Sequence, residues 1–146
     1  MESLVFCIGN RDGGDDAIGP YIADQLPEST DLKVIDCGTI PENYTSVVKQ
    51  YKPKQLLLID AVDMGLSVGE IRIVPKEKIG QMHISTHGIP LSVLMTYLEQ
   101  YAEKVVLIGI QPKHLTRDLS PRVQQSGNML IQLLQSNKID QLPILH

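Results

Sequence analysis

The sequence predicts an α/β fold, a three-layer α/β/α sandwich in which helices cover both faces of a mostly parallel, twisted sheet with an antiparallel edge strand. Short apolar runs alternate along the chain with longer stretches of helical period, which is typical of a parallel sheet covered by helices. The run at 55–63 is continuously apolar at its centre, as expected for a strand buried on both faces. The run at 69–75 alternates apolar and polar residues, which indicates an edge strand.

Four elements are expected in the first half of the chain. Residues 3–9 form an apolar first strand, and the glycine-rich loop after it leads into a helix at 16–27. Pro20 is compatible with this helix, because the first helical turn does not use the N–H group that proline lacks. A second strand at 31–39 precedes a helix at 41–51.

The second half adds three strands and two helices. Strand 55–63 and edge strand 69–75 are followed by an amphipathic helix at 89–102, a buried strand at 104–112 and a last helix at 120–138. The tail after this helix has no pattern that predicts an element. The apolar face expected for the helix at 89–102 consists of Val93, Leu94, Tyr97, Leu98 and Tyr101.

Composition limits the classes of protein that the chain can belong to. Its 146 residues are expected to form a single domain spanning 1–146, with 42% apolar and 21% charged residues. The formal net charge of −4, without a run of Lys or Arg, argues against a nucleic-acid partner, because binding phosphates requires a basic face. No segment approaches the ~20 apolar residues of a membrane span, so no membrane insertion is expected.

The beginning of the chain and the two cysteines indicate a cytoplasmic location. The first ten residues include an acidic side chain and only a short apolar run, which fits a first strand better than a secretory signal. Cys7 and Cys37 do not have zinc-site spacing and are expected to be reduced, buried thiols.

Polar residues are expected at the sheet edge where ligands bind, beside the carboxyl ends of the strands. The loop after the first strand brings Asp15 and Asp16 to this edge. Asp60 follows four aliphatic residues, where a carboxylate is costly to bury without a partner, although a turn-capping role is also common. The residues read as strand ends are Gly9, Asn10, Asp36, Asp60 and Gln111.

The acidic loop is a candidate metal site or a helix cap. It matches neither common phosphate-loop pattern, and its carboxylates would repel a phosphate. Capping of the following helix by Asp15 or Asp16 is the simplest alternative. His87, in a loop just before a helix, adds an imidazole to the carboxylates of Asp16 and Asp60. One imidazole and two carboxylates are a recognised ligand set for a divalent transition metal such as nickel or zinc.

A phosphoacceptor receiver domain is an alternative of a different class. A receiver domain carries an acidic pair, a phosphoacceptor aspartate, a threonine and a lysine, in this order along its chain. The same order is found here in Asp15 with Asp16, Asp60, Thr86 and Lys113. The six-residue spacer between the first strand and the acidic pair argues against it, because the pair of a receiver follows its strand directly. The edge strand also has no place in that scheme.

The chain resembles the hydrogenase maturation proteases, in particular the branch that serves formate-hydrogenlyase-type nickel–iron hydrogenases. The resemblance is carried in order by five stretches: "GNRDGGDDAIGP", "VIDCGTIPEN", "LLLIDAVDMGLSVGEIRIV", "STHGIPL" and "VVLIGIQP". It implies an endopeptidase that removes a C-terminal extension from the hydrogenase large-subunit precursor after nickel insertion. The chain departs from the pattern at Arg11, Asp12 and Gly13, where contacts with the partner are expected to differ.

The resemblance also implies roles for individual residues. It makes Asp16, Asp60 and His87 the metal ligands, and nickel, either resident or carried by the precursor, the expected metal; no nucleotide or organic cofactor is expected. Asp36 matches a recurrent acid that could support the site or position the scissile peptide, with turn capping as its alternative. Three mechanisms remain open: a resident-metal protease, alignment of the peptide by substrate-borne nickel, and an aspartic mechanism with Asp16 or Asp36 as base. A nickel carrier without protease activity would use the same ligands.

Overall fold

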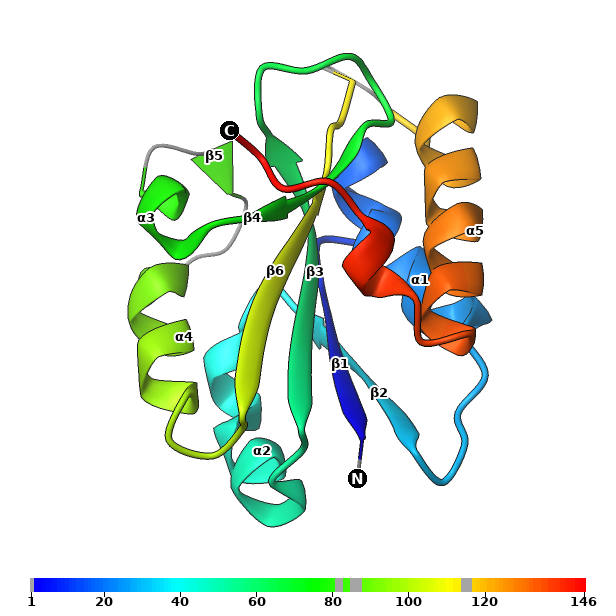
Figure 1. Ribbon diagram of the computed structural model, residues 1–146. Helices are drawn as coiled ribbons and strands as arrows, with labels where there is room; N and C mark the ends of the chain where they lie inside the picture. The colour runs from blue at the N-terminus through cyan, green and yellow to red at the C-terminus, as the bar shows by residue number, and fades with distance from the viewer. Residues whose placement is uncertain (1, 81–82, 85–87, 114–116) are drawn as a thin grey trace.

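The computed structural model describes residues 2–80, 83–84, 88–113 and 117–146, and it confirms the predicted α/β sandwich (Figure 1). The strands are β1 (Ser3–Ile8), β2 (Leu32–Gly38), β3 (Gln55–Asp63), β4 (Ile71–Val74), β5 (His83–Ile84) and β6 (Lys104–Ile110). The helices are α1 (Ile18–Gln25), α2 (Thr45–Tyr51), α3 (Lys76–Ile79), α4 (Leu91–Leu98) and α5 (Pro121–Gln135). Three 3-10 turns, η1 (Gly14–Ala17), η2 (Pro41–Tyr44) and η3 (Ile139–Gln141), complete the described elements.

The strands of the sheet lie in the order β2-β1-β3-β6-β4, and β5 pairs with the end of β3. β1, β2, β3 and β6 run parallel, whereas β4 runs antiparallel to β6 as the predicted edge strand. In the register of the sheet, Cys7 of β1 lies between Asp36 of β2 and Ile59 of β3. The carboxyl ends of the four parallel strands therefore meet at one edge.

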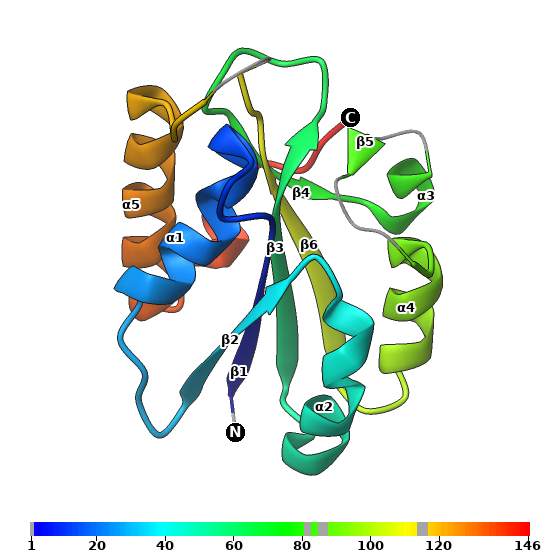
Figure 2. The ribbon, with the colours of Figure 1, turned by 180° about the vertical axis from the view of Figure 1, so that it is seen from behind.

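Helices cover both faces of the sheet, and each face has its own apolar core. Figure 2 shows α1 and α5 on one side of the sheet and α2, α3 and α4 on the other. Val5, Cys7 and Ile59 belong to the core under α1 and α5, whereas Phe6 and Leu58 belong to the core under α2 and α4. This division follows from the two-residue period of a strand, which sends neighbouring side chains to opposite faces.

The prediction for the buried face of α4 is confirmed for Leu94 and Leu98 and wrong for Val93 and Tyr97. Its buried side chains are Leu91, Leu94, Met95 and Leu98. Val93 and Tyr97, which were expected to pack on the sheet, are instead 56% and 38% exposed. Both faces of this helix carry large apolar residues, so its sequence alone supports two rotations about the helix axis.

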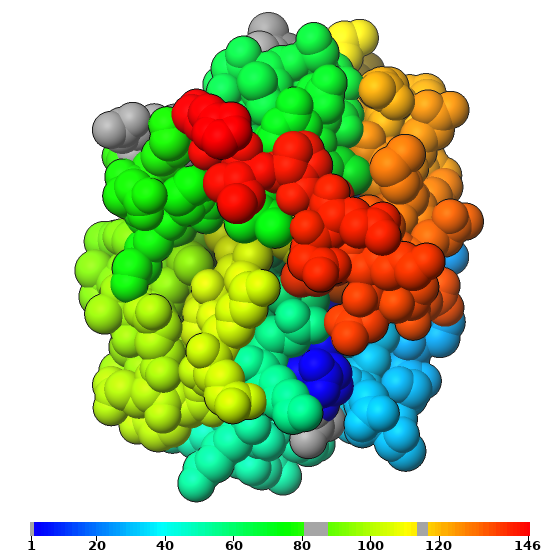
Figure 3. Space-filling view, viewed as in Figure 1, coloured from blue at the N-terminus to red at the C-terminus, as the bar shows by residue number. Residues whose placement is uncertain are grey.

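The C-terminal tail, which has no predictive sequence pattern, is anchored to the edge strand. The backbone of Leu145 donates a hydrogen bond to Ile73, and Ile73 donates one to Pro143. Leu142 and Leu145 are buried. Figure 3 shows this segment lying across the face of the molecule, where it covers the edge of β4. Covering an edge in this way protects unpaired backbone groups from association with other chains.

Candidate active site

The candidate site lies at the carboxyl edge of the sheet, where β1 gives way to the acidic loop. Gly9 follows β1 with a φ of +151°, and a Cβ on this residue would overlap the backbone carbonyl oxygen of Asp16. Only glycine permits this close approach of two backbone segments. The N–H of Asn10 donates to Oδ2 of Asp16 at 2.9 Å. The carboxylate of Asp16 is therefore held beside the end of β1.

Asp60 lies inside β3, three residues before the end of the strand rather than at the end itself. Its side chain is 0% exposed. Leu58 and Val62 pack in the core under α2 and α4, so the alternation of the strand places Asp60 on the same face. η1, which carries Asp16, contacts β3. The structure thus brings together the two segments that carry Asp16 and Asp60.

His87 and Thr86 lie outside the described residues, so the predicted ligand set of Asp16, Asp60 and His87 stays a prediction. Within the described part of the chain, no three Asp, Glu, His or Cys side chains gather as a metal site. Described residues on either side of the histidine are placed near this region. The backbone of Ile84 pairs with Val62 of β3, and Gly88 lies against the carboxylate of Glu42 in η2.

Asp36 lies on the opposite face of the sheet from Asp60. It pairs in register with Cys7, whose side chain belongs to the core under α1 and α5. Oδ1 of Asp36 accepts the N–H of Gly38 at 3.1 Å, which is the turn-capping contact expected as the alternative role. Oδ2 accepts a 2.5 Å hydrogen bond from Nη2 of Arg11. A role for Asp36 in the reaction remains a prediction, because these contacts do not test it.

Arg11 forms a clamp that sequence reasoning missed. Its guanidinium donates to both carboxylate oxygens of Asp24 on α1, at 2.7 and 2.9 Å, and also to Asp36 on β2. The hydrogen bond from Arg11 lowers the pKa of Asp24 below its usual range, and the two carboxylates raise the pKa of Arg11. The acidic loop is thereby tied to both α1 and β2. A lone arginine in a glycine-rich loop carries no sequence signal for these partners, which lie 13 and 25 residues away.

A hollow of about 580 Å³ opens beside the clamp, between the loop after β1 and the loop after β2. This volume falls within the usual range of ligand pockets. The side that faces the candidate site includes Gly9 and Asn10, which also hold Asp16 in place. The residues that line the hollow are Gly9, Asn10, Arg11, Asp36, Cys37, Gly38, Thr39, Ile40 and Tyr44.

Asp15 does not cap the helix that follows it, so that alternative is wrong for this residue. Neither η1 nor α1 begins with a side-chain capping bond. Asp15 is instead buried, at 1% exposed, and accepts hydrogen bonds from the loop between β6 and α5. The donors are the N–H of Lys113 at 2.9 Å and the N–H and hydroxyl of Ser120 at 2.6 and 2.9 Å. Asp15 therefore joins two loops at the carboxyl edge, next to Asp16.

Gln111 supports the loop after β3 from the end of β6. Its side-chain oxygen accepts the N–H groups of Met64 at 2.7 Å and Leu66 at 3.3 Å, and its amide nitrogen donates to Asp63. The side chain is 3% exposed. The position of Gln111 at the end of a buried strand predicts that it lies at the carboxyl edge of the sheet. Nothing in the sequence predicts its hydrogen-bond partners in the loop after β3.

Both cysteines are buried, free thiols, as predicted. Burial raises the pKa of Cys7, and the nearby carboxylate of Asp36 raises it further. Burial also raises the pKa of Cys37. Cys7 belongs to the core under α1 and α5 and Cys37 to the core on the other face. A neutral, buried thiol is a weak nucleophile, so neither residue is suited to covalent catalysis.

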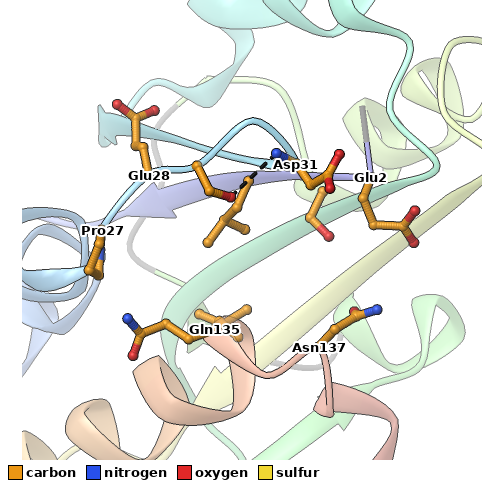
Figure 4. A pocket seen from close by; sticks show the side chains of 10 residues that line it. Glu2, Pro27, Glu28, Asp31, Gln135 and Asn137 are labelled. Carbon is orange, nitrogen blue, oxygen red and sulfur yellow. Dashed lines mark hydrogen bonds between the residues drawn. The ribbon is translucent and has the colours of Figure 1, made fainter.

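A second hollow, of about 410 Å³, lies at the opposite, amino edge of the sheet. Figure 4 shows Glu2 and Asp31, near the starts of β1 and β2, across from Gln135 and Asn137 at the end of α5. Its position at the amino ends of the strands separates it from the acidic loop and from β3 at Asp60.

Comparison with known proteins gives consistent matches. The family model described as hydrogenase maturation protease, HycI, matches residues 19–137. The Hydrogenase 3 maturation protease of Escherichia coli K12 is 38% identical over 115 residues, which cover 77% of this chain and 74% of that protein. A putative hydrogenase maturation protease of Methanocaldococcus jannaschii is 34% identical over 143 residues, which cover 90% of this chain and 85% of its own.

Solved structures agree with these sequence matches. A crystal structure of the Hydrogenase 3 maturation protease has a TM-score of 0.89 and 30% identity, covering 100% of this chain and 97% of its own. The solution structure of the endopeptidase HycI from Escherichia coli has a TM-score of 0.86 and 29% identity, with the same coverage. The hydrogenase maturating endopeptidase HybD from E. coli, at 22% identity and a TM-score of 0.75, shares the fold.

Proposed function

We propose the following mode of action from the premise that this chain belongs to the hydrogenase maturation protease family. It is an endopeptidase that matures a nickel–iron hydrogenase by removing the C-terminal extension of the large-subunit precursor. The comparisons do not favour a receiver domain or a nickel carrier. We further propose that it acts in the cytoplasm and on the nickel-loaded form of the precursor.

The contact between η1 and β3 carries the proposal for the site. It brings the segment of Asp16 to the strand of Asp60, whose carboxylate is fully buried. A buried carboxylate is stabilised by a cation, and carboxylates with an imidazole suit nickel. We therefore assign Asp16, Asp60 and His87 as the residues that hold nickel, whether it is resident or arrives with the precursor. When bound, the metal supplies a Lewis acid that polarises a carbonyl oxygen.

The residues of this chain then have separate roles. Asp16, held by the N–H of Asn10, contributes a carboxylate at the mouth of the site. The hollow beside it is suited to an extended peptide, because it exposes loop backbone and the apolar side chains of Ile40 and Tyr44. Asp36 already accepts hydrogen bonds on both oxygens, from Arg11 and from Gly38. These hydrogen bonds favour a role for Asp36 in positioning the peptide. They do not favour a proton shared between Asp36 and Asp16, because a carboxylate dyad needs direct contact between the two groups.

Cleavage of the precursor tests the proposal. Purified protein is incubated with nickel-loaded large-subunit precursor and with nickel-free precursor, and the products are weighed by mass spectrometry. We expect shortening at the C-terminus only with the nickel-loaded precursor. Asp16→Asn, Asp60→Asn and His87→Ala should each abolish it, whereas Asp31→Asn, an exposed acid at the opposite, amino edge of the sheet, should retain it. Cleavage that survives all three ligand substitutions would overturn the ligand assignment.

The source of the metal is measured separately. Calorimetric titration of nickel chloride into the metal-free protein reports a resident site if binding is tight and if Asp60→Asn abolishes it. Cleavage of nickel-loaded precursor by metal-free protein that binds no nickel identifies the metal as part of the substrate. Full activity of Asp36→Asn would contradict the positioning role of Asp36.

A further inference from the structure

α4 is apolar on a face that the fold leaves uncovered. Leu91, Leu94, Met95 and Leu98 fill the core below it, yet Val93 and Tyr97 on another face are 56% and 38% exposed. Ile89, just before the helix, is 45% exposed. A helix that only covers a sheet needs one apolar stripe. The second apolar face is therefore not explained by the core of this domain.

The exposed residues lie on one helix and just before it. Val93 and Tyr97 are four residues apart within α4, the spacing that places side chains on one side of a helix, and Ile89 lies two residues before the helix begins. We refer to these three residues as the α4 stripe. The remaining large exposed apolar residues in the described chain, Ile40, Met129 and Ile144, come from three other parts of the chain. Single exposed apolar residues are ordinary, but a contiguous set marks an interaction surface.

Positive charge borders the α4 stripe although the protein is acidic overall. The amine of Lys49 lies 5.3 Å from the ring centre of Tyr97 and 5.4 Å from that of Tyr101. Lys76 lies beside Val93 and Tyr97, but its charge is balanced by a 2.7 Å ion pair with Glu99, so Lys49 supplies the positive charge here. A groove of about 470 Å³ is lined by Lys76, Ser92, Val93, Thr96 and Tyr97. Such a surface fits apolar side chains flanked by acidic ones.

The α4 stripe begins close to the hollow of the candidate active site. Ile89 follows Gly88, which lies against Glu42 of η2, and Tyr44 of the same turn lines the hollow. From there α4 runs along the face of the sheet that Asp60 faces, beside α2 (Figure 2). A protein substrate whose scissile bond lies at the carboxyl edge therefore passes close to the α4 stripe.

We propose that the α4 stripe, with Lys49 beside it, docks the hydrogenase large-subunit precursor while its extension is cleaved. This inference rests on the proposed function, because it takes the same precursor as partner. A second copy of this chain is a poorer occupant. The eight residues of α4 span about 12 Å, too short for the roughly 800 Å² per partner that a stable dimer buries. A transient contact with a substrate requires less area.

The test compares variants that are matched in exposure. Val93→Asp places a charge on the α4 stripe, and Met129→Asp places one on α5 at a residue of similar exposure, 58% against 56%. Val93 lies in the first turn of α4, where an acidic side chain interacts favourably with the helix dipole, so the variant is expected to fold. Lys49→Glu tests the charge independently at an exposed position. Binding of immobilised nickel-loaded precursor is measured by interferometry, and thermal melts check folding.

We expect Val93→Asp and Lys49→Glu each to raise the Kd for the precursor about tenfold or more, and Met129→Asp to change it less than twofold. Unchanged Kd values for both stripe variants would overturn the docking surface while leaving the protease function intact. A wild-type dimer in sedimentation that Val93→Asp dissociates would identify a second copy as the occupant and would also overturn it. Wild-type protein that binds but never cleaves the precursor would refute the proposed function and retain the docking surface.

Discussion

Gly9→Ala is expected to damage the site far more than the fold. The new Cβ would meet the carbonyl oxygen of Asp16, which is backbone and has no side-chain freedom with which to move aside. Non-bonded carbon and oxygen atoms approach to only about 3.3 Å. The segment that carries Asp16 must therefore move by on the order of 1 Å, and a misplacement of this size costs about 100-fold in rate.

The backbone conformation of Gly9 determines how much stability the Gly9→Ala variant is expected to lose. Gly9 has a φ of +151°, where an L-residue is strained by about 1–3 kcal/mol. Gly65→Ala is the matched control, because Gly65 also has a positive φ, +69°, but a Cβ there meets nothing within 4 Å. It carries backbone strain of about 1–2 kcal/mol without displacing a neighbour.

Urea unfolding and precursor cleavage separate the two effects. We expect both variants to remain folded at 25 °C, and only Gly9→Ala to lose about 100-fold in kcat/KM. If Gly9→Ala cleaved the precursor at the wild-type rate, the reasoning would be refuted, because the position of Asp16 next to Gly9 would then not affect cleavage. A similar loss of activity in Gly65→Ala would attribute the effect to strain in general.

Three further outcomes follow from single contacts. Gln111→Ala should lower the free energy of unfolding by about 1–3 kcal/mol in urea titrations, because two backbone N–H groups lose their acceptor; an unchanged midpoint would contradict this. The pKa of Asp24 is lowered by Arg11, so the stability from this exposed pair, below about 1 kcal/mol, should be present at neutral pH and lost as the pH falls through the folded pKa; the difference in stability between Asp24→Asn and wild type should therefore be largest near neutral pH and shrink as the pH is lowered. Cys7 and Cys37 should resist alkylation in the native protein and react after denaturation, which mass spectrometry can count.

The sheet and the main helices could be predicted because their patterns are local. The strand at 55–63 was read with the bounds that the structure shows, since four aliphatic residues flanked by polar ones admit few alternatives. The short elements α3 and β5 were missed, because four and two residues are too few to show a period. The tail was missed for a different reason. Its backbone bonds to β4 and its buried leucines join the two cores, and no local pattern records such tertiary contacts.

The orientation of α4 about its axis could not be predicted from its local sequence pattern. Its sequence has apolar residues on two faces, and periodicity alone does not say which face meets the sheet. The prediction chose a face that includes Val93 and Tyr97, and the fold uses the one through Leu91 and Met95. The apolar residues left over are the ones from which we infer the docking surface.

The acids of the candidate site illustrate the same limit at the level of single residues. A strand register that shifts by one residue sends a side chain to the other face, so sequence could place Asp36 and Asp60 at one edge but not on one side. The structure separates them: Asp36 lies with Arg11 on the side of α1, and Asp60 lies on the side of α2 and α4. A metal held by Asp60 would therefore take its remaining ligands from segments that can reach that side. η1 with Asp16 contacts β3 itself, and the described residues flanking His87 lie beside β3 and η2, so the proposed ligand set of Asp16, Asp60 and His87 would leave Asp36 to act on the peptide rather than on the metal.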